Sequence, residues 1–251
     1  MNNNQKQTYE GKSGKGFYRI SAILLIVAGI GGVVLSRLSG MLYASGVPSG
    51  TIGYLQLFSQ HVTLANTDWT LWILVNITII LPSIAMYLVL RNVNKTVAVL
   101  GSAISIPYIV YDDLVTEASS LKLVSLSQSY TVATGAAKAS ILSQATNIVN
   151  ALPLMTFFSF TVGAVGWLLW SVLMPKTFFR RTTAVFGVIV NVMGILGGIA
   201  VWVSALGIFN VFGALLTALW FILVGAQLLR QQHRPTNAVQ TGAQTIKPTP
   251  M

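Results

Sequence analysis

The chain has 251 residues, of which 54% are hydrophobic and 8% are charged. Because soluble domains usually carry about a quarter charged residues, this composition and a mean hydropathy of +0.72 exclude an ordinary soluble protein. The net charge of +10 favours a lipid bilayer as the partner. The lysines and arginines lie between apolar runs and in the terminal segments, and no aromatic and basic stripe indicates nucleic acid. With no Cys, disulfides, thiol catalysis and Cys-based zinc sites are excluded.

Residues 1–18 are rich in Asn, Gln, Lys and Gly, which predicts a disordered cytoplasmic tail. Six apolar runs follow, each close to the roughly 20 residues that cross a bilayer, and together they predict one membrane domain over residues 19–230. The polar residues 231–251, with three prolines, are again predicted to be disordered. The predicted spans are 20–38, 71–90, 96–111, 148–174, 184–206 and 209–229.

The first span has a second interpretation. A basic segment, an apolar run and the small residues after Tyr43 also match a cleavable signal peptide. Both interpretations place the following segment outside, so the rest of the threading does not depend on the choice.

Two long outer connections are expected to contain helices, because structureless loops of such length are uncommon. In residues 39–68, apolar side chains at helical spacing predict a short amphipathic helix on the outer surface, at Ile52, Leu55, Phe58 and Val62. Residues 112–146 form the second connection, with apolar positions at Leu114, Leu121, Val124 and Leu126. A tight turn at Gly207 joins the last two spans. The predicted fold is all-α: a polytopic membrane protein with six transmembrane helices and short amphipathic helices in two outer loops.

The turn from Arg91 to Lys95 fixes the orientation of the chain. Cytoplasmic segments are enriched in Lys and Arg, and placing this turn inside puts twelve of the 15 basic residues inside, since three fall outside. We therefore predict a multi-pass protein of the plasma (inner) membrane with both termini cytoplasmic. The three outer residues are Arg37, Lys122 and Lys138, and the residues that set the topology are Arg19, Arg91, Lys95, Lys176, Arg180, Arg181 and Arg230.

Three stretches resemble one known family. They are the opening of the first span at Arg19–Leu25, the turn at Tyr87–Thr96 and the segment Val165–Leu169 before a basic loop. In this order they are similar to the bacterial domain-of-unknown-function family 4386, whose members are small multi-span membrane proteins with no assigned activity. The chain departs from that family at Asn92, where Pro is usual, and at residues 178–181, where it reads Phe-Phe-Arg-Arg. The resemblance implies a membrane fold and no catalytic residue.

The acidic residues after the third span are the candidate site for a cation or other ligand. If the helix continues past Asp112, then Asp113 and Glu117 are four residues apart and share a face, which would suit a bound cation or a carboxylate pair. The alternative is a solvated helix end that keeps the span from sliding inward. His61 is the one histidine before the C-terminal tail and joins this candidate site. Because a zinc site needs three ligands, no metal and no cofactor are predicted.

Polar residues and glycines inside the spans are expected to pack helices together. Interhelical hydrogen bonds account for most such polar residues, here Asn76, Ser83, Ser102, Ser105, Tyr108 and Asn191. A glycine-rich face suits close helix packing, a partner helix or a second copy of the chain. The fifth span has such a face at Gly187, Asn191, Gly194 and Gly198, and Gly29 and Gly32 offer a matching surface on the first span.

Three functions remain open. The first is non-enzymatic handling of a small solute or lipid, or assistance to another membrane component, and a carrier would need a polar cavity that reaches mid-membrane. The second is a membrane-embedded enzyme at the outer face, which needs His61 within a few Å of Asp112, Asp113 and Glu117. The third is a scaffold or sensor subunit whose glycine face is exposed to lipid and binds a partner helix.

Overall fold

The computed structural model describes residues 3–232, and every element in that part of the chain is helical. Six stretches are long and apolar enough to cross a membrane. The helical class and these six helices confirm the prediction at that level. The elements are α1 (Asn3–Leu42), α2 (Gly50–Gln60), α3 (Val62–Leu90), α4 (Lys95–Tyr111), the π-helix η1 (Asp112–Glu117), α5 (Ala118–Val132), α6 (Gly135–Leu173), the 3₁₀ helix η2 (Met174–Lys176), α7 (Arg181–Ile199), the 3₁₀ helix η3 (Ser204–Leu206) and α8 (Gly207–Gln232).

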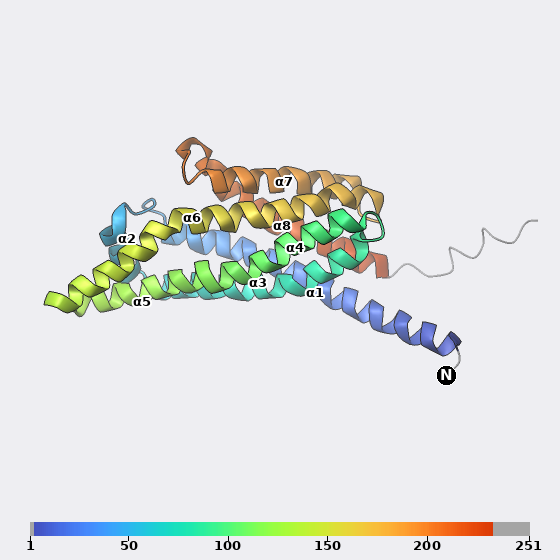
Figure 1. The fold of residues 1–251 in the computed structure, drawn as a ribbon, viewed down its shortest axis with the longest axis horizontal. Helices are drawn as coiled ribbons and strands as arrows, with labels where there is room; N and C mark the ends of the chain where they lie inside the picture. The colour runs from blue at the N-terminus through green and yellow to red at the C-terminus, as the bar shows by residue number, and fades with distance from the viewer. Residues whose placement is uncertain (1–2, 233–251) are drawn as a thin grey trace, which may run out of the picture.

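The long helices lie side by side along the length of the molecule (Figure 1). Helix α1 packs against both α8 and α3, α4 packs on α6, and α7 packs on α6 and α8. Each of these pairs is antiparallel. At one end of the bundle, α5 and the beginning of α6 extend beyond the other helices, with α2 beside α6 (Figure 1).

Helix α1 is apolar on opposite faces. One face is buried, with Ala22, Leu25, Ala28 and Leu35 in contact with the bundle. A helix that is hydrophobic all round is suited to a protein core or to lipid and not to water. The exposed face of α1 therefore suits lipid. It consists of Ile20, Ile23, Val27, Ile30 and Val34.

Two separate clusters of buried apolar side chains hold the bundle together. The larger cluster contains Trp170 and Trp220 and extends from Ile79 and Ile109 toward Leu90. The smaller cluster joins the end of α1 to α2, α5 and the beginning of α6. Its members are Leu42, Leu55, Leu57, Phe58, Ala65, Leu123, Val124 and Ala145.

The second connection, residues 112–146, which the sequence predicts to lie outside, is a helical hairpin and not a loop with short helices. Helix α4 continues through η1 and α5 to Val132, and α6 begins at Gly135. The helix continues because no Gly or Pro interrupts residues 108–134, and such residues are the usual helix breakers. Gly135, with a φ of 53°, stands at the turn into the return helix.

Helix α2 confirms the short helix predicted in the first outer connection. It buries Leu55 and Phe58 and packs on α5. Only His61 separates α2 from α3, so the second long helix begins at Val62 and not near residue 71. Val62, which the sequence pattern assigned to the short helix, therefore begins α3.

The chain differs from the prediction at two further places. Helix α7 ends at Ile199, and residues 200–206 connect it to α8, which begins at Gly207; the connection is held against α6 by Trp202 and Phe157, whose ring centroids are 4.9 Å apart. Helix α1 begins at Asn3, within the predicted tail, because extending a helix costs much less than starting one. The first two residues of the predicted C-terminal tail, 231 and 232, belong to α8. The rest of that predicted tail lies outside the residues that the structure describes.

The residues predicted to set the topology gather at one end of the bundle, which we call the basic end. They lie in the first part of α1, at the ends of α3, α6 and α8, and at the beginnings of α4 and α7. All seven are exposed. These residues are Arg19, Arg91, Lys95, Lys176, Arg180, Arg181 and Arg230.

Candidate functional site

Four acidic side chains lie in the half of the bundle far from the basic end, and we call them the carboxylate cluster. Asp68 comes from α3, and Asp112, Asp113 and Glu117 come from η1. Asp68 has no exposed surface, Asp112 and Glu117 are each 4% exposed, and Asp113 is half-buried. On both α3 and the α4–α5 helix, these residues fall between the two apolar clusters. Their burial argues against the solvated helix end considered from the sequence.

The π-helix η1 decides which carboxylates face inward. Buried positions along α4 recur every three or four residues up to 112, then after a step of five they continue at 117, 120, 124 and 127. In an α-helix, five residues would turn Glu117 about 140° away from Asp112. The wider turn, in which the Ala118 N–H donates to the Asp113 carbonyl oxygen, keeps both on the buried face. Glu117 therefore shares the buried face with Asp112, whereas the spacing of four residues in the sequence predicts a pair with Asp113.

Asp112 accepts hydrogen bonds from neutral side chains on three helices. Asn76 Nδ2 on α3 donates to Asp112 Oδ2 at 3.2 Å and to Asp113 Oδ1 at 3.0 Å, and so links two acidic side chains. The Tyr108 hydroxyl on α4 donates to Asp112 Oδ2 at 3.3 Å. Ser159 on α6 donates to Asp112 Oδ1. Asp112 therefore ties α3, α4 and α6 together at one level.

Asp68 and Glu117 have different partners. The Ser39 hydroxyl on α1 lies 3.0 Å from Asp68 Oδ1 and 2.9 Å from Oδ2, whereas the buried Oε2 of Glu117 has no hydrogen-bond partner. Just beyond α1, burial raises the pKa of the Tyr43 hydroxyl above its usual value, and Tyr54, Asp68 and Glu117 raise it further. Within the described chain, every hydrogen-bond donor to the cluster is a neutral side chain.

His61 lies apart from Asp112 and Asp113. It is exposed in the break between α2 and α3, and Asn76, which contacts Asp113, lies about 22 Å farther along α3 at 1.5 Å per residue. Within residues 3–232, no group of three or more His, Asp or Glu side chains is arranged to hold a metal ion. The structure brings Asp112, Asp113 and Glu117 together without His61.

No family model, curated protein or solved structure matches this chain. The resemblance to family 4386 stays a prediction.

Sequence reasoning missed Ser39, Asp68 and Ser159. For Asp68 a signal was present, because the buried positions of α3 follow a helical repeat at 65, 68, 76, 79, 83, 86 and 90. That repeat puts Asp68 and Asn76 on the face that also buries Ile79. For Ser39 and Ser159 no comparable signal exists, since a serine in an apolar helix often bonds only to its own backbone.

The glycines of α7 lie against other helices of the same chain. A Cβ atom added at Gly194 would lie 3.0 Å from the Ala164 Cβ on α6, and one at Gly198 would collide with the Thr161 side chain. Both glycines are buried. The face that the scaffold hypothesis requires to be exposed is therefore covered by α6.

The glycines of α1 do not match this face. Gly29 and Gly32 lie against α8, where an added Cβ at Gly29 would approach the Ala218 carbonyl oxygen to 2.5 Å. Asn191 on α7 donates to the Gly187 carbonyl oxygen at 2.7 Å and is buried. All six predicted packing residues thus lie inside the bundle.

Proposed function

We propose that this chain is a multi-pass protein of the plasma (inner) membrane with both termini cytoplasmic, and that it has a non-enzymatic role. In this role the carboxylate cluster takes up protons from the outer side. The six long apolar helices and the exposed apolar face of α1 support insertion in a bilayer. The gathering of exposed Lys and Arg at one end supports the orientation, because cytoplasmic segments are enriched in basic residues.

The depth of Asp112 and Asp113, the two carboxylates that contact Asn76, supports a functional role. At 1.5 Å per residue, Asn76 lies about 21 Å along α3 from Leu90 at the basic end, and Asp68 lies about 33 Å from it. A hydrocarbon layer is about 30 Å thick, so Asn76 and its carboxylate partners fall in the outer third of that layer. Ionisable residues at such depth are expensive and mark ion or proton sites by default.

The observation that carries the proposal is the lack of a counter-charge at a buried acidic pair. Asp112 and Glu117 are almost fully buried, the donors to Asp112 are neutral, and Oε2 of Glu117 has no partner. Burying an uncompensated ion costs several kcal/mol. A bound proton removes that cost without any rearrangement of the helices, and within the described residues no group of three or more His, Asp or Glu side chains is arranged to hold a metal ion instead.

Access is supported from the outer side only. Toward the basic end, the bundle is filled by aromatic side chains, and the void among Trp167, Trp170 and Trp220 measures about 10 Å³, at the lower limit for one water molecule. Asp68 and Ser39 lie near the outer end of α3 and α1. A buried site that lies near the outer end and is blocked toward the basic end suits a sensor of the outer medium.

The test is infrared spectroscopy of the purified protein in lipid nanodiscs at neutral pH. We expect a carbonyl stretch from protonated carboxyl groups, which weakens in Asp112→Asn and in Glu117→Gln. Asp113→Asn is the matched control, because Asp113 is half-buried and should contribute less to the band. A wild-type spectrum with carboxylate bands alone, or equal spectra for the wild type and all three variants, would contradict the proposal.

The orientation has its own test. Reporter fusions after Lys95 and after Arg181 should give cytoplasmic signals, and a fusion after Lys122 on the extended α5 should give an external signal. An external signal after Lys95 would sink this threading.

A further inference from the structure

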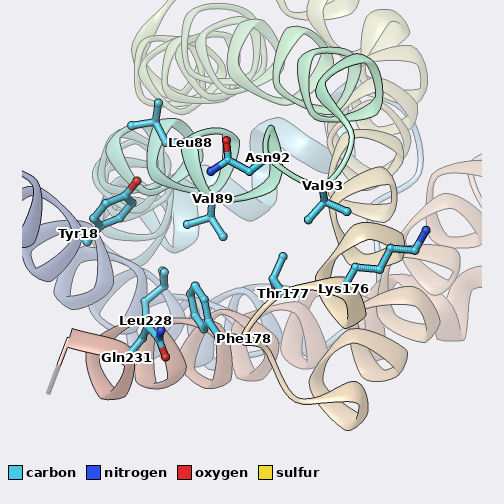
Figure 2. A pocket seen from close by; sticks show the side chains of 10 residues that line it. All are labelled: Tyr18, Leu88, Val89, Asn92, Val93, Lys176, Thr177, Phe178, Leu228 and Gln231. Atoms are coloured by element: carbon cyan, nitrogen blue, oxygen red, sulfur yellow. The ribbon is translucent and has the colours of Figure 1, made fainter. Parts of the chain in front are cut away.

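A hollow opens at the basic end of the bundle, on the side opposite the carboxylate cluster. It measures about 600 Å³ and lies between α1, the end of α3, the end of α8 and the segment that joins α6 to α7. Figure 2 looks into it and shows side chains from these separate elements around a common space. Its volume is within the range of small-molecule sites, about 300–1,000 Å³.

The lining has an apolar part and a polar part. The apolar part consists of Leu88, Val89, Val93, Phe178 and Leu228. Neutral hydrogen-bonding groups and one ammonium group make up the polar part: Asn92, Thr177 and Gln231 stand among the apolar side chains, and Lys176 lies at one edge with its ammonium group turned outward (Figure 2). This combination suits an amphiphile whose head can accept hydrogen bonds and whose body is hydrocarbon.

The positive charge around the hollow favours an amphiphile with a negatively charged head group. Arg91 and Arg180 lie at the end of α3 and the beginning of α7, Arg19 lies in the first part of α1, and all three are exposed. All four carboxylates whose side chains the structure describes lie in the other half of the bundle, so nothing acidic among them offsets this positive field. The sequence after Gln232 contains Arg234 and Lys247 and no Asp or Glu. A basic segment of that kind is repelled by the same field and is a poor occupant.

We propose that the hollow binds the head and upper acyl chain of an anionic phospholipid of the cytoplasmic leaflet, with Lys176 contacting the phosphate. The assignment to that leaflet rests on the proposed function and its orientation. The cytoplasmic leaflet supplies anionic lipids, and basic pockets between membrane helices on this side are suited to their head groups. A free phosphate ion has no apolar part to cover the sides of Val89, Val93 and Phe178 that line the hollow.

The test uses native mass spectrometry of the full-length protein in mild detergent, with phosphatidylglycerol and phosphatidylcholine of identical acyl chains as the probes. The wild type should retain phosphatidylglycerol in preference to phosphatidylcholine. Lys176→Gln should lower that preference about fivefold, since one lysine near a lipid surface contributes about 1 kcal/mol. Lys138→Gln is the matched control, because Lys138 is exposed near the opposite end of α6, and it should leave the preference unchanged.

A second variant tests the contribution of the apolar lining separately from that of the Lys176 charge. Val89→Trp fills the apolar part and should abolish retention of both lipids while the melting temperature stays close to that of the wild type. Equal retention of the two lipids by the wild type, an equal effect of Lys138→Gln and Lys176→Gln, or displacement of the lipid by inorganic phosphate alone would overturn the proposal. Asp112→Asn should bind the lipid normally. A failure of lipid binding is thus distinguishable from a failure of the proton site.

Discussion

The two ends of the bundle treat charge in opposite ways. At the basic end, seven cationic side chains are exposed, whereas in the other half three of four carboxylates are buried between helices. An exposed charge costs little and contributes little to stability, so it is free to set the threading. A buried charge without a counter-ion costs several kcal/mol. Exposed and buried charged residues therefore play different roles in this protein, and the burial of each side chain distinguishes the two.

The helices of the basic half are closely packed where α4 meets α6. A Cβ atom at Gly166 would lie 2.8 Å from the Gly101 carbonyl oxygen, and backbone cannot move aside as a side chain can. We expect Gly166→Ala to lower the free energy of unfolding by about 1–3 kcal/mol. Gly40→Ala, with open space around Gly40, should raise it by up to about 1 kcal/mol. Reversible unfolding in detergent micelles measures both, and equal effects would mean that α4 and α6 are not tightly packed.

In the other half, an effect of similar size is expected from the loss of one hydroxyl group. Ser39→Ala removes the hydroxyl that lies within hydrogen-bond distance of both carboxylate oxygens of the buried Asp68, and a hydrogen bond to a charged group contributes about 1.5–3 kcal/mol. We expect a loss of about 2 kcal/mol in the free energy of unfolding. Ser36→Ala is the control, because Ser36 donates only to the Gly32 carbonyl oxygen of its own helix. If Ser39→Ala and Ser36→Ala lower the free energy of unfolding by the same amount, the contact between Ser39 and Asp68 does not stabilise the fold.

The smallest effect is expected at the basic end. Arg181→Gln removes an exposed cation at the beginning of α7, where the helix dipole disfavours positive charge. The free energy of unfolding should stay within about 0.5 kcal/mol of the wild-type value, measured in the same micelles. A loss as large as that of Ser39→Ala would remove the contrast between exposed and buried charge.

Particular residues show how far the sequence could go. The six long apolar helices were predictable because an apolar run of sufficient length has few alternatives to a helix in lipid. Helix α2 was predictable from the spacing of Leu55 and Phe58. The hairpin of α5 and α6 was not, because its serine-rich helices combine polar and apolar residues and resemble a connection in composition.

Only part of the candidate site could be predicted from the sequence. Asp112, Asp113 and Glu117 are conspicuous in so apolar a chain, but the one-residue phase shift of η1 has no clear mark in the sequence. Without that shift, Glu117 would turn away from Asp112. Ser39 and Ser159 entered the site only when α1 and α6 were packed beside α3 and η1.

By itself, the sequence determined that this protein is built from apolar helices, and it predicted which end is basic. Both follow from composition and from the order of charges along the chain, which are local properties. Only the tertiary structure decided that the carboxylates are buried, that Asp112 rather than Asp113 faces inward with Glu117, and that His61 lies elsewhere. Burial and proximity depend on which helices become neighbours, and that choice is made by packing across segments far apart in the chain.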